Sequence, residues 1–167
     1  MKTLMLPLAF VLSFLGLTFA ANAAVAADSS VSGYYRAEGK EAKLTFARSG
    51  KGESYSDQPA VAIAFTEKDA SDAKEVSADA IAFSHKYGSA ITMNVSKNSE
   101  GVYEVADSAF HHSGSEKAGG NASGILQLKD VVVANGVISG EVYTKPDTDM
   151  FGAKIDIDLK FKVPMPK

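Results

Sequence analysis

The adjacent histidines His111 and His112 are the most chemically suggestive residues, with Glu116 close behind them and His85 available as a third imidazole. Imidazole nitrogens and carboxylate oxygens are common ligands of zinc and copper. Neighbouring residues of a strand point to opposite faces, whereas residues on one face stand two positions apart. His111 and His112 therefore converge only in a turn, so we predict no metal site and no cofactor. They remain the candidate residues for binding a small ligand.

A second pattern has the spacing of a calcium-binding loop. Asp147, Asp149, Gly152 and Asp158 occupy the first, third, sixth and twelfth positions of an EF-hand loop, but the last position lacks the bidentate Glu. Asp158 also falls within an alternating strand pattern, where a calcium loop should give way to a helix. We therefore interpret these residues as a hairpin connection with acidic residues at its turn positions.

The sequence carries no catalytic signature. It has no cysteine, which excludes thiol catalysis, iron–sulfur clusters and Cys-ligated zinc. It has no Gly-x-Ser-x-Gly elbow, and Ser113 and Ser115 beside His112 indicate a loop more than a triad. Asp156 and Asp158 share one strand face, but an open charged face does not give two carboxylates separate environments. We predict a protein that acts by binding and not by catalysis.

Tyrosines are the remaining residues that suggest a ligand, since several aromatic rings on one surface could form a platform for carbohydrate. The chain has no Trp, and we therefore favour the core and rim positions that tyrosine normally takes. The six tyrosines are Tyr34, Tyr35, Tyr55, Tyr87, Tyr103 and Tyr143.

Residues 1–27 have the pattern of a secretory signal peptide. Lys2 supplies the positive start, an almost wholly apolar run follows, and small-residue cleavage sites occur over residues 21–27. Pro7 and Gly16 interrupt the apolar run, which argues against a membrane anchor. A mature N-terminus without cysteine carries no lipid. We therefore predict a soluble exported product, either periplasmic or secreted, with no membrane insertion after signal removal.

The charge of the chain limits its partners. The 17 Lys and Arg residues face 20 Asp and Glu residues, which gives a formal net charge of −3. No segment concentrates basic residues, and an acidic protein is repelled by phosphates and by anionic lipid headgroups. We therefore exclude nucleic acid as a partner and expect a protein or another component of the cell envelope.

The clearest structural pattern lies at the C-terminal end, where charged and apolar residues alternate strictly over residues 154–163. This period predicts a strand with one buried face and one solvent face. Residues 124–134 and 137–144 are rich in β-branched side chains and meet at Asn135-Gly136. Both turn residues tolerate the positive φ of a type I′ turn, which predicts an antiparallel hairpin.

Five further strands are expected upstream, which gives eight in all. Two of them flank Gly39-Lys40, which suits a two-residue turn with Gly first. Residues 60–66 alternate large and small apolar side chains, a pattern typical of a central strand covered on both faces. The five predicted strands cover residues 31–37, 42–47, 60–66, 91–96 and 102–105.

Residues 69–85 differ from the rest, because they are rich in Ala and place Ala73, Val76 and Ala80 at helical spacing. We predict one short helix there, covering an end or edge of the sheets. Residues 48–59 and 113–123 are predicted to be long loops. Many short strands with little helix predict an all-β fold, an antiparallel β-sandwich in one domain over residues 28–167.

Several stretches are also similar to a known group of proteins. They are residues 33–40 with 42–44, 64–70, 137–140, 149–152 and 155–161. In their strand and turn positions they resemble a family of small exported bacterial proteins of unknown function. The resemblance implies one compact exported domain. It implies no activity, cofactor or catalytic residue.

Together these observations predict a non-enzymatic exported β-sandwich that serves as a binding module in the cell envelope. The alternative is a periplasmic carrier of a metal or another small ligand that uses the region of His111 and His112.

Overall fold

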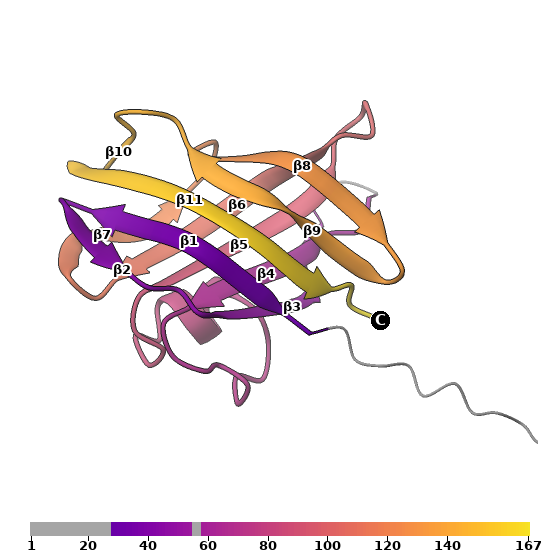
Figure 1. The fold of residues 1–167 in the computed structure, drawn as a ribbon, viewed down its shortest axis with the longest axis horizontal. Coiled ribbons are helices and arrows are strands. Elements are labelled where there is room, and N and C mark those ends of the chain that lie inside the picture. The colour runs from indigo at the N-terminus through magenta and orange to yellow at the C-terminus, as the bar shows by residue number, and fades with distance from the viewer. Residues whose placement is uncertain (1–27, 55–57) are drawn as a thin grey trace, which may run out of the picture.

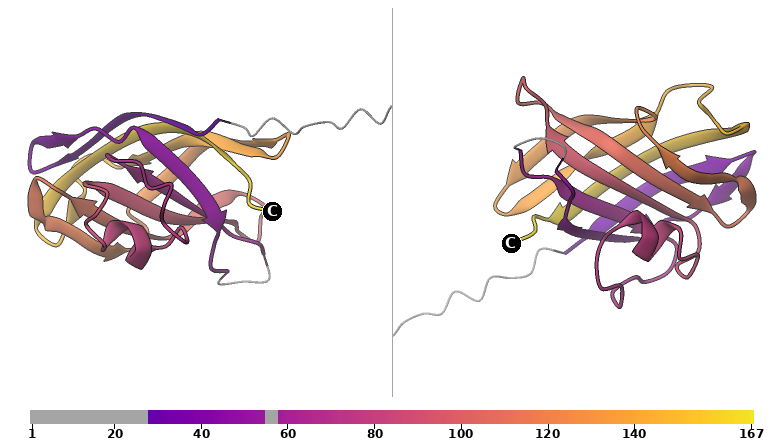
Figure 2. Two further views of the ribbon diagram at one scale, coloured as in Figure 1. Left: turned by 90° about the horizontal axis from the view of Figure 1, so that it is seen from below. Right: turned by 180° about the vertical axis from the view of Figure 1, so that it is seen from behind.

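Two antiparallel sheets lie face to face in the computed structural model, which describes residues 28–54 and 58–167 (Figures 1 and 2). This arrangement confirms the predicted all-β sandwich. The predicted signal peptide lies outside the described residues. The strands are β1 Ser30–Ala37, β2 Lys40–Ala42, β3 Phe46–Lys51, β4 Val61–Thr66, β5 Ala90–Lys97, β6 Tyr103–His112, β7 Ser115–Ala122, β8 Leu126–Ala134, β9 Val137–Thr144, β10 Asp149–Met150 and β11 Ala153–Pro164, and the helical turn is η1 Ala78–Ala82.

The two sheets are built differently. The five-stranded sheet is a meander in chain order, β3-β4-β5-β6-β7, whereas the six-stranded sheet has the order β2-β1-β11-β9-β8 with β10 paired to β11. The last strand therefore lies between the first strand and β9, and the sheet brings together the two ends of the described chain (Figure 1). Within the described residues, no helix is long and apolar enough to cross a membrane.

Strand β11 confirms the alternation predicted at the C-terminal end. Every second residue from Ile155 to Val163 is buried, and the lysines and aspartates between them face outward. Phe161 of β11 contacts Phe65 of β4, with ring centroids 5.6 Å apart, so the core joins the two sheets. Strand β4 is buried along its whole length, as predicted for a strand covered on both faces.

Of the two predicted tight turns, one is confirmed and one is shifted. Asn135 and Gly136 have φ values of 52° and 73° and connect β8 to β9, as in a type I′ turn. The turn between β1 and β2 consists of Glu38 and Gly39, with φ values of 49° and 77°, and not of Gly39 and Lys40. Ala37 pairs with Lys40, so Lys40 already belongs to the second strand.

The prediction of eight strands was too low, since the described residues form eleven. The predicted strand 42–47 is divided between β2 in one sheet and β3 in the other. Strand β3 extends to Lys51 and so occupies part of the first predicted loop, and β7 occupies most of the second. Strand β7 is rich in Gly and polar residues, but its backbone pairs with β6, and such pairing does not require β-forming side chains.

The predicted helix over residues 69–85 is mostly irregular and contains one turn of π-helix, η1, whose N-cap Ser77 accepts a hydrogen bond from the Ala80 amide. The prediction that this segment covers an end or edge of the sheets was wrong. It lies on the outer face of the five-stranded sheet (Figure 2), where Val76 and Ile81 pack against small side chains such as Ala64. The small residues of the sheet make room for this third layer.

Candidate functional site

The structure places His111 and His112 on opposite faces of β6. The ring of His111 stacks on that of His85 on the outer side of the five-stranded sheet, with centroids 3.9 Å apart and an interplanar angle of 18°. His112 is only 2% exposed and packs edge-on against Tyr35 of β1, with centroids 4.9 Å apart. The structure therefore brings His85 to His111 but separates His111 from His112.

The buried imidazole of His112 is oriented by its own loop. Its Nδ1 accepts a hydrogen bond from the Gly114 amide at 3.1 Å, so the neutral ring carries its proton on Nε2. Within the described residues, His112 Nε2 and the Tyr35 hydroxyl are buried without a hydrogen-bond partner. Burial also raises the pKa of Tyr35. Both groups are therefore neutral parts of the core.

Ser113 does not form a triad with its neighbour His112. Its hydroxyl donates to Glu67 Oε2 at 3.1 Å, and its amide donates to the hydroxyl of Ser89 at 2.9 Å. Burial raises the pKa of Glu67, but the hydrogen bonds from Ser89 and Ser113 outweigh burial and the pKa is lowered overall. A catalytic triad needs the imidazole between the hydroxyl and the carboxylate, which is not the arrangement here.

His111 and His112 line a hollow of about 890 Å³ together with His85, Lys40 and Lys117. We call this cavity the histidine hollow. Glu116 also lines it. No group of three or more His, Asp or Glu side chains within the described residues is arranged to hold a metal ion.

The calcium-like pattern forms a hairpin connection, in line with our interpretation. Asp147 pairs with Lys154 at 3.3 Å, and Asp149 accepts a hydrogen bond from the Gly152 amide at 2.9 Å. Asp158 lies further along β11, on the outer face of the six-stranded sheet. These carboxylates therefore make separate local contacts.

Acidification should destabilise the fold through the two histidines of β6. Burial lowers the pKa of His111, helped by the charges of His85 and His112, and burial also lowers the pKa of His112. The unfolded chain therefore binds more protons as the pH falls below about 6.5, and stability is lost in that range. We expect a lower melting temperature at about pH 5.5 than at about pH 7.5.

The His111→Gln variant should reduce this pH dependence, which thermal melts at both pH values will measure. Glu67 does not contribute to the loss of stability above about pH 5. Its pKa is lowered, so its carboxylate stays charged in that range. A melting temperature that rises on acidification would contradict the assignment.

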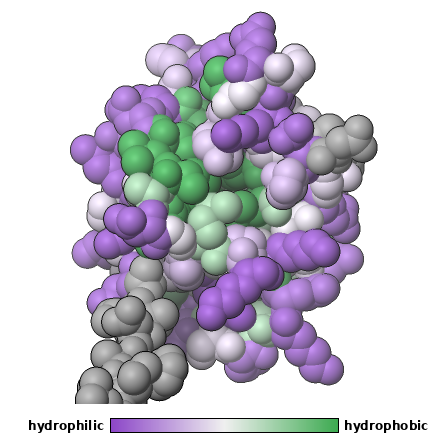
Figure 3. All heavy atoms as spheres, turned by 90° about the vertical axis from the view of Figure 1, so that its right-hand side faces the viewer, coloured by the Kyte–Doolittle hydropathy of each residue, from purple (hydrophilic) through white to green (hydrophobic). Residues whose placement is uncertain are grey.

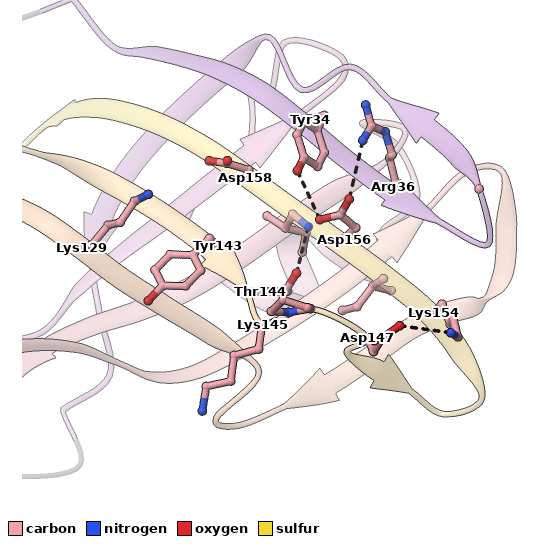
Figure 4. A pocket seen from close by; sticks show the side chains of 14 residues that line it. Tyr34, Arg36, Lys129, Tyr143, Thr144, Lys145, Asp147, Lys154, Asp156 and Asp158 are labelled. Atoms are coloured by element: carbon pink, nitrogen blue, oxygen red, sulfur yellow. Dashed lines mark hydrogen bonds and ion pairs between the residues drawn. The ribbon is translucent and has the colours of Figure 1, made fainter.

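A second site lies on the outer face of the six-stranded sheet (Figure 4). Sequence reasoning did not find it, because it assigned the tyrosines to core and rim positions and not to a shared surface. Tyr34 of β1 pairs in register with Asp158 of β11, and Asp158 pairs with Tyr143 of β9. Tyr-Asp-Tyr therefore forms one row across three adjacent strands. Because strands are about 4.8 Å apart, the two tyrosine backbones are separated by about 10 Å. We call this row and its neighbours Arg36, Asp156 and Lys129 the tyrosine face.

Cations and hydrogen bonds position the two tyrosine rings. The guanidinium of Arg36 lies 4.0 Å from the ring centroid of Tyr34, and Lys129 Nζ lies 5.3 Å from that of Tyr143. The Tyr34 hydroxyl donates to Asp156 Oδ1 at 3.3 Å. Burial, followed by the charge of Asp156, raises the pKa of Tyr34, so its hydroxyl stays protonated. These contacts restrict the rings before any ligand arrives.

The charges around the row are paired with one another. Arg36 contacts Glu41 at 2.8 Å and Asp156 at 3.6 Å, and Glu141 contacts Lys129 at 2.8 Å and Lys160 at 3.3 Å. The hydrogen bond from Lys129 is the main cause that lowers the pKa of Glu141. Three cations and three anions therefore cancel across these two clusters.

Asp158 differs from the other carboxylates of this face, because its side chain forms no hydrogen bond or ion pair with the described residues. It lines a hollow of about 560 Å³ with Tyr34, Tyr143 and Lys145. The surface thus offers two aromatic rings, an available carboxylate acceptor and a nearby ammonium donor. This combination can bind a polar ligand by stacking and hydrogen bonding.

A third surface lies at the end of the sandwich near the β8–β9 turn, where apolar side chains gather (Figure 3). Val102, Val132 and Val133 are 57%, 56% and 40% exposed. These side chains carry no hydrogen-bonding group, and so they select no particular class of ligand.

Comparison with known proteins gives no relative: no family model, curated protein or solved structure matches the chain.

Proposed function

We propose that this protein is a non-enzymatic, exported binding module that uses the tyrosine face to bind a component of the cell envelope. The observation that supports the proposal best is the row Tyr34-Asp158-Tyr143, because three separate strands supply it in register. A sheet is a rigid support, and groups held on it need little ordering when they bind. The resemblance to small exported bacterial proteins is consistent with this role.

Export is the part of the proposal that rests on the sequence of residues 1–27. Cleavage at one of the small-residue sites should leave an N-terminus between Ala24 and Asp28. Mass spectrometry of the native protein will measure it. An intact Met1 on protein in the membrane fraction would show that the segment is retained.

Binding can be tested by sedimentation of the purified protein with an envelope preparation from the cells that make it. The wild-type protein should sediment with the envelope, and the Tyr34→Ala/Tyr143→Ala variant should sediment about tenfold less. The Asp79→Ala variant is the matched control, because Asp79 is exposed in the segment that covers the other sheet. Equal sedimentation of all three proteins would exclude the tyrosine face.

The second candidate function is a carrier of a metal or another small ligand in the histidine hollow. The volume of 890 Å³ and the presence of His85, His111 and His112 in its lining favour this candidate. Small-ligand sites commonly have volumes of this order.

Because His111 and His112 lie on opposite faces of β6, we expect zinc or copper to leave the melting temperature unchanged. A metal that bound the folded state at a hundredfold excess over Kd would stabilise it by about 2.7 kcal/mol. Thermal melts with and without metal will decide. A rise of several degrees that His112→Ala abolishes would favour the carrier.

A further inference from the structure

We infer that the tyrosine face binds an uncharged glycan chain, an inference that rests on the proposed function and names the class of its ligand. A sugar ring has an apolar face of C–H groups and a rim of hydroxyls. The row Tyr34-Asp158-Tyr143 has the matching alternation of aromatic ring, hydrogen-bond acceptor and aromatic ring.

The spacing of the row favours a chain over a single sugar. Tyr34 and Tyr143 lie on either side of β11, which separates their backbones by about 10 Å. One sugar ring stacked on one tyrosine does not also cover the other. A chain of several sugars contacts both tyrosines and passes over Asp158 between them.

The polar groups of the row suit hydroxyl groups. The Asp158 carboxylate has two acceptor oxygens and no hydrogen bond or ion pair with described residues, so sugar hydroxyls can donate to it without displacing an existing contact. Lys145 lines the same hollow and can donate to a hydroxyl or ring oxygen. The Tyr34 hydroxyl already donates to Asp156, which leaves its oxygen free to accept.

The charge of the face favours an uncharged ligand. Arg36 is paired with Glu41 and Asp156, and Glu141 is paired with Lys129 and Lys160. A polyanion needs unpaired cations, and a basic peptide needs a surplus of carboxylates. Neither surplus is present in these two clusters, where cations and anions are equal in number.

The test uses the same envelope preparation in three forms: untreated, oxidised with periodate, and digested with proteinase K. Periodate cleaves the vicinal diols of sugars, and the protease removes protein. We expect periodate to lower sedimentation of the purified protein at least tenfold, while proteinase K leaves it unchanged. An uncharged ligand also predicts the same sedimentation at low and at high NaCl concentration.

Variants connect this result to the tyrosine face. Asp158→Ala should lower periodate-sensitive sedimentation about tenfold, and Tyr143→Phe, which keeps the ring, should retain more binding than Tyr143→Ala. Asp79→Ala is the control for the loss of one exposed carboxylate. Thermal melts of each variant will separate loss of binding from loss of fold.

The outcomes separate this inference from the proposed function. No sedimentation with the untreated envelope contradicts both. Sedimentation that survives periodate but not proteinase K identifies a protein partner, which overturns the glycan inference and leaves the binding module in place. Binding that periodate abolishes but that also disappears at high salt identifies a charged glycan and overturns the inference as stated.

Discussion

Replacing Leu159 with alanine will lower the free energy of unfolding by about 3–5 kcal/mol, whereas replacing its neighbour Asp158 will change it by less than about 0.5 kcal/mol. Leu159 is fully buried in the central strand of the six-stranded sheet, and its loss leaves a cavity between the sheets. The Asp158 side chain points to the opposite face, and its carboxylate has no hydrogen bond or ion pair with the described residues. Urea denaturation will measure both variants.

The comparison of these adjacent residues tests the orientation of β11. If β11 were turned by one residue, each of its inward side chains would face outward and Asp158 would lie in the core. Equal, small losses for Leu159→Ala and Asp158→Ala would contradict the orientation described here.

Replacing Gly33 with alanine will have a similarly large effect, about 3–5 kcal/mol, although the change adds only a methyl group. Gly33 has a φ of 123°, a conformation that L side chains rarely adopt. A Cβ atom there would lie 2.0 Å from the backbone oxygen of Asp158. The two strands would have to separate at the position where they carry the Tyr-Asp-Tyr row.

Gly39 provides the control for this prediction. It also has a positive φ, 77°, but a Cβ atom at Gly39 would meet nothing within 4 Å. Gly39→Ala should therefore cost only the backbone strain of about 1 kcal/mol. Denaturation curves in which both alanine variants lose the same stability would show that the contact between β1 and β11 is not as close as described.

Local patterns of the sequence predict much of the fold. The alternation in β11 and the Asn135-Gly136 turn depend on neighbouring residues, and both are confirmed. Strand β7 was missed because its Gly-rich composition gives no strand signal and its structure depends on pairing with β6. The predicted position of residues 69–85 was also wrong. Packing against the outer face of a sheet is a tertiary contact, which the local sequence pattern does not show.

The tyrosine face illustrates the same limit for the candidate site. Tyr34 precedes Asp156, to which it donates a hydrogen bond, by 122 positions. The sequence shows that Asp156 and Asp158 share a face, but it does not show which strands lie beside them. Only the order β1-β11-β9 brings Tyr34 and Tyr143 to either side of Asp158.

The central claim is that this face of the six-stranded sheet contacts the envelope, and single cysteines can test it directly because the chain has none of its own. Four variants place a thiol at exposed positions: Ser32→Cys beside the tyrosine face, Glu116→Cys at the histidine hollow, Asp79→Cys over the five-stranded sheet and Val102→Cys at the apolar end. The measurement is the rate of maleimide labelling with and without the envelope preparation. The account predicts that the envelope slows labelling at Ser32→Cys and leaves the other three rates unchanged. Slower labelling at Glu116→Cys, Asp79→Cys or Val102→Cys, with no change at Ser32→Cys, would contradict it.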